Sequence, residues 1–378
     1  MPDLADHPGS DDRNQDPPTA QETPMQPYDV RNAAAADPVP WDERTAYERW
    51  EADQGIPIIE GFYIPDLTAV DMGYWEEMGC HGALVELDGT EETNGSYILK
   101  VAAQEATLWQ KRMFEELLYV AEGEGLTEVR SSDDRITVCR WRRGSVFGVP
   151  LNFEYRHIAT EQSVLYCVHS APMVMNLFHN DRFVFDNPFQ QFDRFDGSED
   201  FFSPNGRFWA RKDGATIWET NLVEDVRALE LPPFEARGAG GTNVCFELAD
   251  GTVVAHVSEF PAATYKKAHR HGPGAHVIML TGEGYTLLWR NSLDDVVDIK
   301  WTDNAIIVPP GMWWHQHFNV GETPAAYLAM RWGSWKHRLN HHSDNIAMDR
   351  RSGGDQIDYD DEDPKIRELF AQRRDGNW

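Results

Sequence analysis

Short runs of alternating apolar and polar residues cover most of the chain, with Gly, Pro, Asn and Asp between them. Alternation with a period of two predicts half-buried β-strands, and many short strands with turn signals are typical of a sandwich or barrel. Two stretches have a helical period instead, Trp41–Asp53 and Pro364–Arg374. The pattern predicts an all-β body with a few short helices.

The chain also contains an internal repeat. "FEELLYVAEGEGLTEVR" at 114–130 is similar to "GAHVIMLTGEGYTLLWR" at 274–290, and each reads as a strand, a GEG turn and a second strand. "GSVFGVPLNFEYRH" at 144–157 is similar to "NAIIVPPGMWWHQH" at 304–317. Both correspondences have the same order and an offset of about 160 residues, so we expect two similar β units in tandem.

The repeat and the composition predict five segments. Residues 1–40 are rich in Asp, Pro, Ala and Gln and cannot bury enough apolar surface to fold, so we expect disorder. Residues 41–180 form the first unit with its leading helix, and 242–345 form the second. The aromatic segment 181–241 is a connector expected to pack on both units. Residues 346–378 are an acidic tail whose short helix is available to dock on a neighbouring subunit.

Histidines are concentrated in the second unit, where nine of the 14 lie between His256 and His342. In a strand, residues i and i+2 face the same way, so His269 and His271 point together. His315 and His317, in "PPGMWWHQHFN", also share a face, and either is a candidate third ligand. Three neutral imidazoles leave a divalent metal its full charge and open positions, which suits an anionic chelating substrate beside dioxygen.

The two histidine stretches, "HRHGPGAHVIMLTGEG" and "VPPGMWWHQHFN", resemble the two motifs of the cupin superfamily. The resemblance covers both repeats, roughly residues 75–345. It implies a bicupin, an all-β protein with two tandem double-stranded β-helix (jelly-roll) barrels. Within the superfamily the motifs look most similar to gentisate 1,2-dioxygenase and related ring-cleaving enzymes, which hold Fe(II) with three histidines. Carried over by motif, the ligands are His269, His271 and His315. His315 is preferred to His317 because it precedes Asn319 by the spacing H-x₃-N.

The second unit departs from the cupin pattern in several places. The position of the metal-binding Glu of many cupins holds Ala275, as expected for a three-histidine site. His276 follows it and becomes a fourth ligand only if a bulge turns it inward, because a regular strand places it on the opposite face. The second motif has one extra residue before His315, and Asp303 stands where a glycine usually opens it.

The first unit retains Glu116 but has lost the ligands. "WQKRMFEE" replaces the HxH stretch, and Tyr155 stands at the expected third ligand. His157 alone cannot build a site. We expect this barrel to be metal-free and structural, with one alternative, in which Arg112 or Lys111 binds a substrate anion from another subunit.

Four large apolar residues on or beside the motif strands, Met279, Trp289, Trp313 and Trp314, predict an aromatic pocket for a planar or apolar substrate. Ordinary barrel core explains part of this set equally well. Arg331, at the end of the strand after the second motif, is a candidate clamp for a substrate carboxylate, and Gln316 is a weaker candidate for a polar contact.

Charge and hydropathy limit the classes of binding partner that we expect for this chain. The chain has 34 basic and 63 acidic residues, a net charge of −29, so it would repel phosphate backbones, and we expect no nucleic-acid partner. No run of 18 apolar residues occurs, so we expect no membrane span. With no secretory signal visible, a cytoplasmic location is expected. Bicupins of this kind often form homodimers or homotetramers, which the resemblance implies here.

The resemblance implies a mononuclear non-haem Fe(II) dioxygenase. It would use O₂ to cleave a C–C bond of a hydroxylated aromatic (gentisate- or salicylate-like) or enolic small molecule. One alternative is a non-oxidative lyase, decarboxylase or isomerase that uses Mn, Ni or Zn. A second is a cupin that binds a small ligand without turnover.

Overall fold

The computed structural model describes residues 40–190, 193–339, 347–376 and 378. Arg44–Trp378 forms one compact unit. The segment predicted to be disordered lies outside the described residues except for Pro40. The first predicted helix is shorter than expected: α1 spans Ala46–Asp53, because Thr45 and Glu48 form a capping box that starts the helix there.

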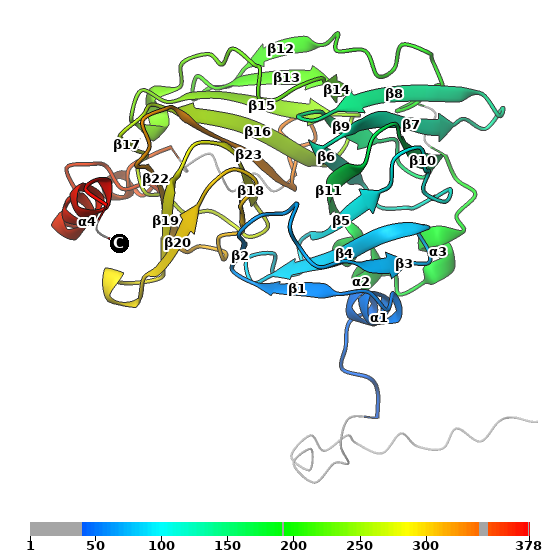
Figure 1. Cartoon of the computed structure of the whole chain (residues 1–378), viewed down its shortest axis with the longest axis horizontal. Coiled ribbons are helices and arrows are strands. Elements are labelled where there is room, and N and C mark those ends of the chain that lie inside the picture. Colours follow the sequence, from blue (N-terminus) through cyan, green and yellow to red (C-terminus); the bar gives the residue numbers. More distant parts are fainter. Residues whose placement is uncertain (1–39, 191–192, 340–346, 377) are drawn as a thin grey trace, which may run out of the picture. The chain divides into compact units, whose positions relative to one another are not determined.

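The first β unit has one large and one small sheet (Figure 1). The large sheet contains β1 (Ile58–Gly61), β3 (Gly73–Trp75), β4 (Cys80–Leu87), β5 (Gly95–Val101), β6 (Glu116–Glu122), β9 (Val146–Val149), β11 (Ser163–His169) and β14 (Leu222–Val223). The small sheet contains β7 (Glu124–Arg130), β8 (Ile136–Arg142) and β10 (Glu154–Ala159). Two helices follow, α2 (Ala171–Phe178) and α3 (Asp181–Phe185).

The second β unit repeats this arrangement. Its large sheet contains β2 (Tyr63–Ile64), β12 (Arg207–Ala210), β13 (Thr216–Thr220), β15 (Thr242–Leu248), β16 (Val253–Phe260), β18 (His276–Thr281), β21 (Ile306–Ile307) and β23 (Ala325–Trp332). Its small sheet contains β17 (Thr264–Tyr265), β19 (Gly284–Trp289), β20 (Val297–Trp301) and β22 (Trp314–Asn319). Short 3₁₀ turns lie at Glu235–Arg237, Leu293–Asp295 and Arg350–Ser352, and α4 spans Pro364–Arg374.

The two halves have the same strand order. The large sheets run β4-β5-β11-β6-β9 and β15-β16-β23-β18-β21, and the small sheets run β10-β7-β8 and β22-β19-β20. Both small sheets also bury the same polar triad, Trp141–Thr127–His157 in one and Trp301–Thr286–His317 in the other. This order and register confirm the predicted fold class, two tandem jelly-roll barrels of the bicupin type.

Each repeat includes strands that precede the first of its two motifs in the sequence. β1 pairs in parallel with β4 of the first barrel, and the next strand, β2, crosses to pair with β21 of the second. β13 pairs in parallel with β15 of the second barrel, and β14 crosses back to β9 of the first. Each barrel is therefore completed by a strand from the other's leading segment. The predicted connector at 181–241 contains the first strands of the second repeat, not only linking chain.

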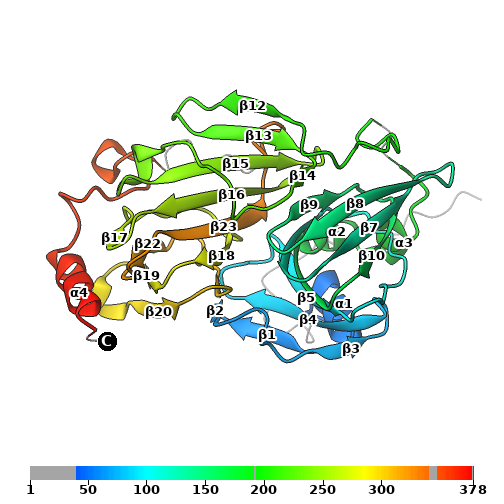
Figure 2. The same ribbon diagram turned by 45° about the horizontal axis from the view of Figure 1, so that its top comes forward.

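The two large sheets lie side by side (Figure 2). They share an apolar core, which fixes the barrels against each other within this unit. Side chains such as Val85 and Tyr119 from the first sheet join Phe246, Ile278 and Leu328 from the second. Separate clusters fill the interiors of the first and second barrels. In β18, Val277 and Met279 face the barrel interior and Ile278 and Leu280 face the other barrel, as the period of two requires.

The C-terminal helix packs on its own chain. Ile366, Leu369 and Phe370 of α4 join Tyr285 and Phe318 on the outer face of the small sheet. The expectation that this helix docks on a neighbouring subunit is therefore corrected, because its apolar residues already have an intramolecular partner. No helix among the described residues is long and apolar enough to span a membrane.

Candidate metal centre

Three of the predicted ligands lie together inside the second barrel. His269, His271 and His315 form a group whose candidate ligand atoms all lie within 4.8 Å of one another. The ring centroids of His269 and His315 are 4.0 Å apart, and those of His271 and His315 are 4.7 Å apart. His269 and His315 are buried and His271 is half-buried.

The backbone explains why the rings converge. His269 follows β17 on an extended segment and pairs with His315 of β22 in an antiparallel bridge. Residues opposite each other in such a bridge project to the same side, and His271 returns to that side two residues later. The segment is fixed near His271 by the Met312 N–H, which donates to the His271 carbonyl oxygen at 2.7 Å.

The imidazole nitrogens fit metal coordination. His271 Nδ1 donates to the Gly272 carbonyl oxygen at 2.7 Å, and His315 Nδ1 donates to the Trp313 carbonyl oxygen at 3.2 Å. These bonds leave the Nε2 lone pairs of both rings free, as metal-binding histidines require. His269 Nδ1 is buried and has no hydrogen-bond partner. A buried polar nitrogen without a partner costs about 1–3 kcal/mol, a cost that an ion or a water would offset.

Burial also keeps these rings neutral. Burial is the main cause that lowers the pKa of each of the three histidines, to about 3 for His271. Charge repulsion lowers these pKa values further: it comes from Arg331 and Arg237 at His271, and from Arg237 and the neighbouring imidazoles at His269 and His315. Neutral imidazole is the form that binds metal, so the site is ready for a divalent cation at neutral pH.

The two further candidate ligands lie elsewhere. His276 faces the other barrel, where its Nδ1 lies 2.7 Å from the Tyr166 hydroxyl oxygen. His317 faces the barrel interior two residues below His315, and its Nδ1 lies 2.8 Å from Thr286 Oγ1. Neither belongs to the three-histidine group. β18 begins without the bulge that a fourth ligand at His276 would need, and Ala275 lines the pocket in its place.

A small pocket opens on the group, and its polar lining is mainly cationic. Arg211, Arg237 and Arg331 line it together with His256, His269 and His271, while Asp213 is its one carboxylate. Asp213 pairs with Arg211 at 2.6 Å. Arg331 points inward from β23, and its Nε is buried without a hydrogen-bond partner. Burial lowers the pKa of Arg331, and burial with the neighbouring arginines lowers that of Arg237 to about 10.

The predicted aromatic pocket does not form. Met279 packs in the interior core, and Trp313 packs beside Phe62. Trp289 and Trp314 face the opposite side of the small sheet, toward the C-terminal segment. None of the four predicted residues lines the pocket beside the histidines. The aromatic residues that do line it are Phe234, Tyr327 and Trp335, of which Phe234 comes from the connector.

Gln316 also points away from the pocket. Its Nε2 donates to the Lys266 carbonyl oxygen at 2.8 Å, and Trp314 and Phe318 on the same face pack in the outer cluster. The alternation of β22 explains this: if His315 and His317 face inward, the residue between them faces outward. Sequence reasoning missed Arg211 and Arg237 instead, because no motif marks them and both lie in the connector.

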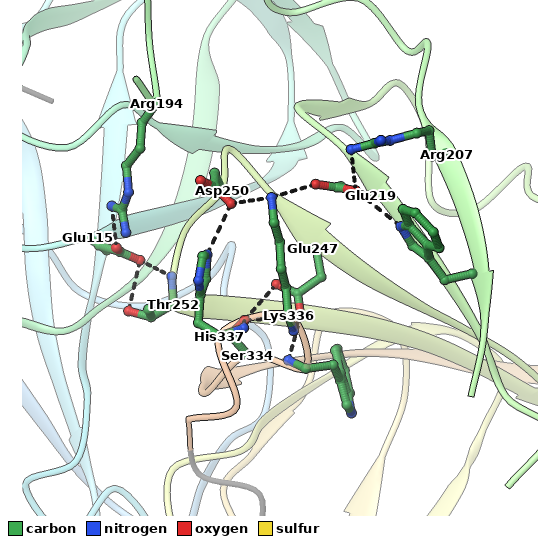
Figure 3. A network of polar contacts seen from close by, with 12 residues as sticks. Glu115, Arg194, Arg207, Glu219, Glu247, Asp250, Thr252, Ser334, Lys336 and His337 are labelled. Carbon is green, nitrogen blue, oxygen red and sulfur yellow. Dashed lines mark hydrogen bonds and ion pairs between the residues drawn. The ribbon is translucent and has the colours of Figure 1, made fainter. Parts of the chain in front are cut away.

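A segment after β23 borders the pocket and is held by a polar network (Figure 3). Glu247 accepts hydrogen bonds from Ser334 Oγ and from the backbone N–H groups of Trp335 and Lys336. The Lys336 ammonium pairs with Asp250 and with Glu219. This network fixes Trp335 at the pocket, where its ring lies 5.7 Å from the Arg331 guanidinium carbon.

In the first barrel, residues other than histidine stand at the positions of the three candidate ligands. Gln110 and Tyr155 form the bridge that corresponds to His269 and His315. Arg112 lies two residues beyond Gln110, and its Nη1 pairs with Glu116 Oε1 at 3.0 Å.

Glu116 corresponds to Ala275 and also accepts hydrogen bonds from Tyr97 and Tyr155. An internal ion pair thus occupies the first barrel's centre. Arg112 is buried in it and is not available to bind an external anion.

No protein-family model and no curated protein matches this chain. Similarity to solved structures is weak. An oxalate decarboxylase deletion mutant of Bacillus subtilis aligns at 11% identity and a TM-score of 0.47, covering 73% of this chain and 78% of that one. The formate complex of the Lactobacillus farciminis oxalate decarboxylase aligns at 14% identity and a TM-score of 0.46, covering 72% and 86%.

A further structure, of Bacillus subtilis oxalate decarboxylase with Mn(II) centres, aligns at 12% identity and a TM-score of 0.45, covering 75% of this chain and 78% of that one. TM-scores below 0.5 carry no argument about activity, metal or substrate. The bicupin arrangement therefore rests on the strand order and register of this chain.

Proposed function

We propose that the chain is a divalent-metal enzyme that cleaves a carbon–carbon bond in a small carboxylate substrate. The observation that carries the proposal is the pairing of a three-histidine group with Arg331, whose buried Nε has no partner and which lines the same pocket. A buried guanidinium N–H without an acceptor is costly, and a bound anion would offset that cost.

Three groups of residues would have separate roles: metal binding, carboxylate binding and exclusion of water. His269, His271 and His315 would hold the metal, which would supply a Lewis acid for the substrate's oxygen atoms with open positions beside them. Arg331, with Arg237 beside it, would orient the carboxylate through charge-assisted hydrogen bonds. Trp335 and Phe234 would exclude water from the bound substrate.

Two types of carbon–carbon bond cleavage are candidates for a three-histidine metal site beside arginines. Non-oxidative cleavage, such as decarboxylation with Mn, Ni or Zn, is favoured by a small cationic pocket without the predicted aromatic walls. Fe(II)- and O₂-dependent cleavage of a hydroxylated aromatic acid is favoured by the absence of a carboxylate from the histidine group within the described residues. The pocket lining makes the non-oxidative reaction our first choice and the dioxygenase reaction our second.

The test begins with metal content, measured by mass spectrometry on protein purified anaerobically, with His269→Ala/His271→Ala as the control. The metal-loaded protein is then supplied with oxalate while CO₂ is measured, and with gentisate while O₂ uptake is measured. Manganese, nickel or zinc with CO₂ release supports the first reaction, and iron with O₂ uptake supports the second. Metal-free protein that turns over neither compound contradicts the proposal.

A further inference from the structure

A buried lysine lies next to the pocket and has no part in the metal site. Lys266 is 2% exposed, and its Nζ donates to Ser258 Oγ. Nζ also lies 5.4 Å from the centre of the Phe260 ring and 5.3 Å from that of Tyr327. In the described part of the chain no carboxylate pairs with it. Fully buried, unpaired lysines are rare, so this one calls for an explanation.

Lys266 is connected to the pocket by its neighbours. Ser258 and Tyr327 line the pocket together with His269 and Arg331, whereas Lys266 itself lies behind them. The Lys266 backbone is fixed by its N–H, which donates to the His317 carbonyl oxygen at 3.0 Å. A single hydrogen bond, from Nζ to Ser258 Oγ, therefore links the ammonium group to a hydroxyl that lines the pocket.

The surroundings of Lys266 favour proton exchange near neutral pH. Burial, and then repulsion by Arg237, lowers the pKa of Lys266 to about 7. Two of the groups that face it stay uncharged: burial lowers the pKa of His256 and of His317 far below 7. Burial raises the pKa of Tyr327, which also stays neutral. Lys266 is thus charged below about pH 7 and neutral above it, while these three neighbours do not change.

We propose that Lys266 is the proton source of this site and delivers its proton to the bound substrate through Ser258. The proposal rests on the proposed function, which supplies the acceptor: the carbon or oxygen atom left negative when the carbon–carbon bond breaks. Lys266 gives one proton to Ser258 Oγ while Ser258 gives its own proton to the substrate. No electron leaves the protein, and solvent restores the lysine proton. At rest Ser258 Oγ donates to the Thr242 carbonyl oxygen at 3.0 Å, so the hydroxyl must turn toward the pocket.

A first test needs neither metal nor substrate. The full chain is labelled with trace acetic anhydride between pH 5 and 10, and acetylation of Lys266 is followed by mass spectrometry, with the exposed Lys212 as the reference for reagent. We expect half-maximal reactivity of Lys266 near pH 7. A midpoint near 10, where ordinary lysines titrate, overturns the proposal. No labelling at any pH also overturns it, because the amine would then be out of reach of the pocket.

A second test uses the enzyme with its metal and the compound that it turns over. Lys266→Met is expected to lower kcat at least 100-fold, with metal content unchanged and KM within about threefold, and to remove the ionisation near pH 7 from the kcat profile. Ser258→Ala should lower kcat and keep the ionisation.

The matched control is Lys267→Met, which removes the neighbouring lysine that pairs with Asp358 at 2.7 Å. An unchanged pH profile in Lys266→Met overturns the proton relay alone. Wild-type protein that turns over no compound contradicts the proposed function, and the labelling then still decides whether Lys266 titrates near pH 7.

Discussion

His269 and His315 exchange both of their backbone hydrogen bonds: the His269 N–H donates to the His315 carbonyl oxygen at 3.0 Å, and the His315 N–H donates back at 2.8 Å. Two residues paired in this way project their side chains to one side of the ladder. Metal affinity should therefore depend on this bridge as well as on the rings themselves.

The first prediction concerns the ligand set. His315→Ala and His269→Ala should each lower the metal content at least tenfold, because each removes one of three ligands. His317→Ala should keep most of the metal and lose stability instead, since it removes one of the two buried partners of Thr286 Oγ1 and leaves only Trp301. Mass spectrometry for metal and urea unfolding check the two effects.

His276→Ala is the control for that experiment, because its ring contacts Tyr166 in the other barrel. Metal loss in His276→Ala equal to that in His269→Ala would contradict the three-histidine assignment. Metal loss in His317→Ala but not in His315→Ala would exchange the roles of those two residues.

The second prediction concerns the anion. Arg331→Met should weaken oxalate binding to the metal-loaded protein about 10- to 100-fold, because a hydrogen bond to a charged group contributes about 1.5–3 kcal/mol. Titration calorimetry measures the change. Arg211→Met is the matched control and should have a smaller effect, since Arg211 already pairs with Asp213. Equal affinity of Arg331→Met and wild type would contradict the assigned role.

The third prediction concerns pH and stability. The Glu51 carboxyl on α1 and the Glu86 carboxyl on β4 hydrogen-bond to each other, and burial is the main cause that raises their pKa values, to about 7 and about 9. A carboxyl whose pKa is raised on folding stabilises the protein fully below its unfolded pKa, near 4.5, and loses that contribution as pH rises through the folded value.

Stability should therefore fall between about pH 4.5 and 9. Glu86→Gln, which keeps a hydrogen-bonding side chain, should raise the free energy of unfolding at pH 8 by about 1 kcal/mol and flatten the decline. Urea unfolding at pH 5, 6.5 and 8 measures this, with Glu60→Gln on the exposed part of β1 as the control. Equal pH slopes in Glu86→Gln and wild type would be the contrary result.

The fourth prediction concerns the first barrel. Arg112→Met leaves the buried Glu116 carboxyl without its cationic partner, so it should destabilise the protein by about 3–5 kcal/mol. Arg112→Met/Glu116→Gln should recover part of that loss. Chemical unfolding measures both variants. Metal content in the second barrel should not change if the first barrel is structural, and its loss in the double variant would argue against that role.

Much of the local structure could be predicted from the sequence. The period of two gave the strands, the inward face shared by His269 and His271, and the outward direction of His276. The two repeats predicted two barrels, because equal patterns of strands and turns build equal units. The same period also excludes Gln316 from the pocket, because Gln316 lies between two inward histidines.

The pocket could not be predicted in this way. Met279, Trp289, Trp313 and Trp314 are close to the motifs in sequence, yet none lines the pocket beside the histidines. The alternation along a strand decides whether a side chain faces into the barrel or out of it. Whether an inward side chain packs in the core or lines a cavity depends on the side chains of the opposite sheet.

The sequence by itself determined the strands, the tandem repeat and the imidazoles that share one face, since these follow from local periodicity. The tertiary structure alone decided what surrounds them. Arg211 and Arg237 reach the pocket from the connector, β2 and β14 cross between barrels, and Ser258 joins Lys266 to the pocket. These relationships join residues far apart in the chain, and they arise from the closure of two sheets around one interior, which no short sequence window records.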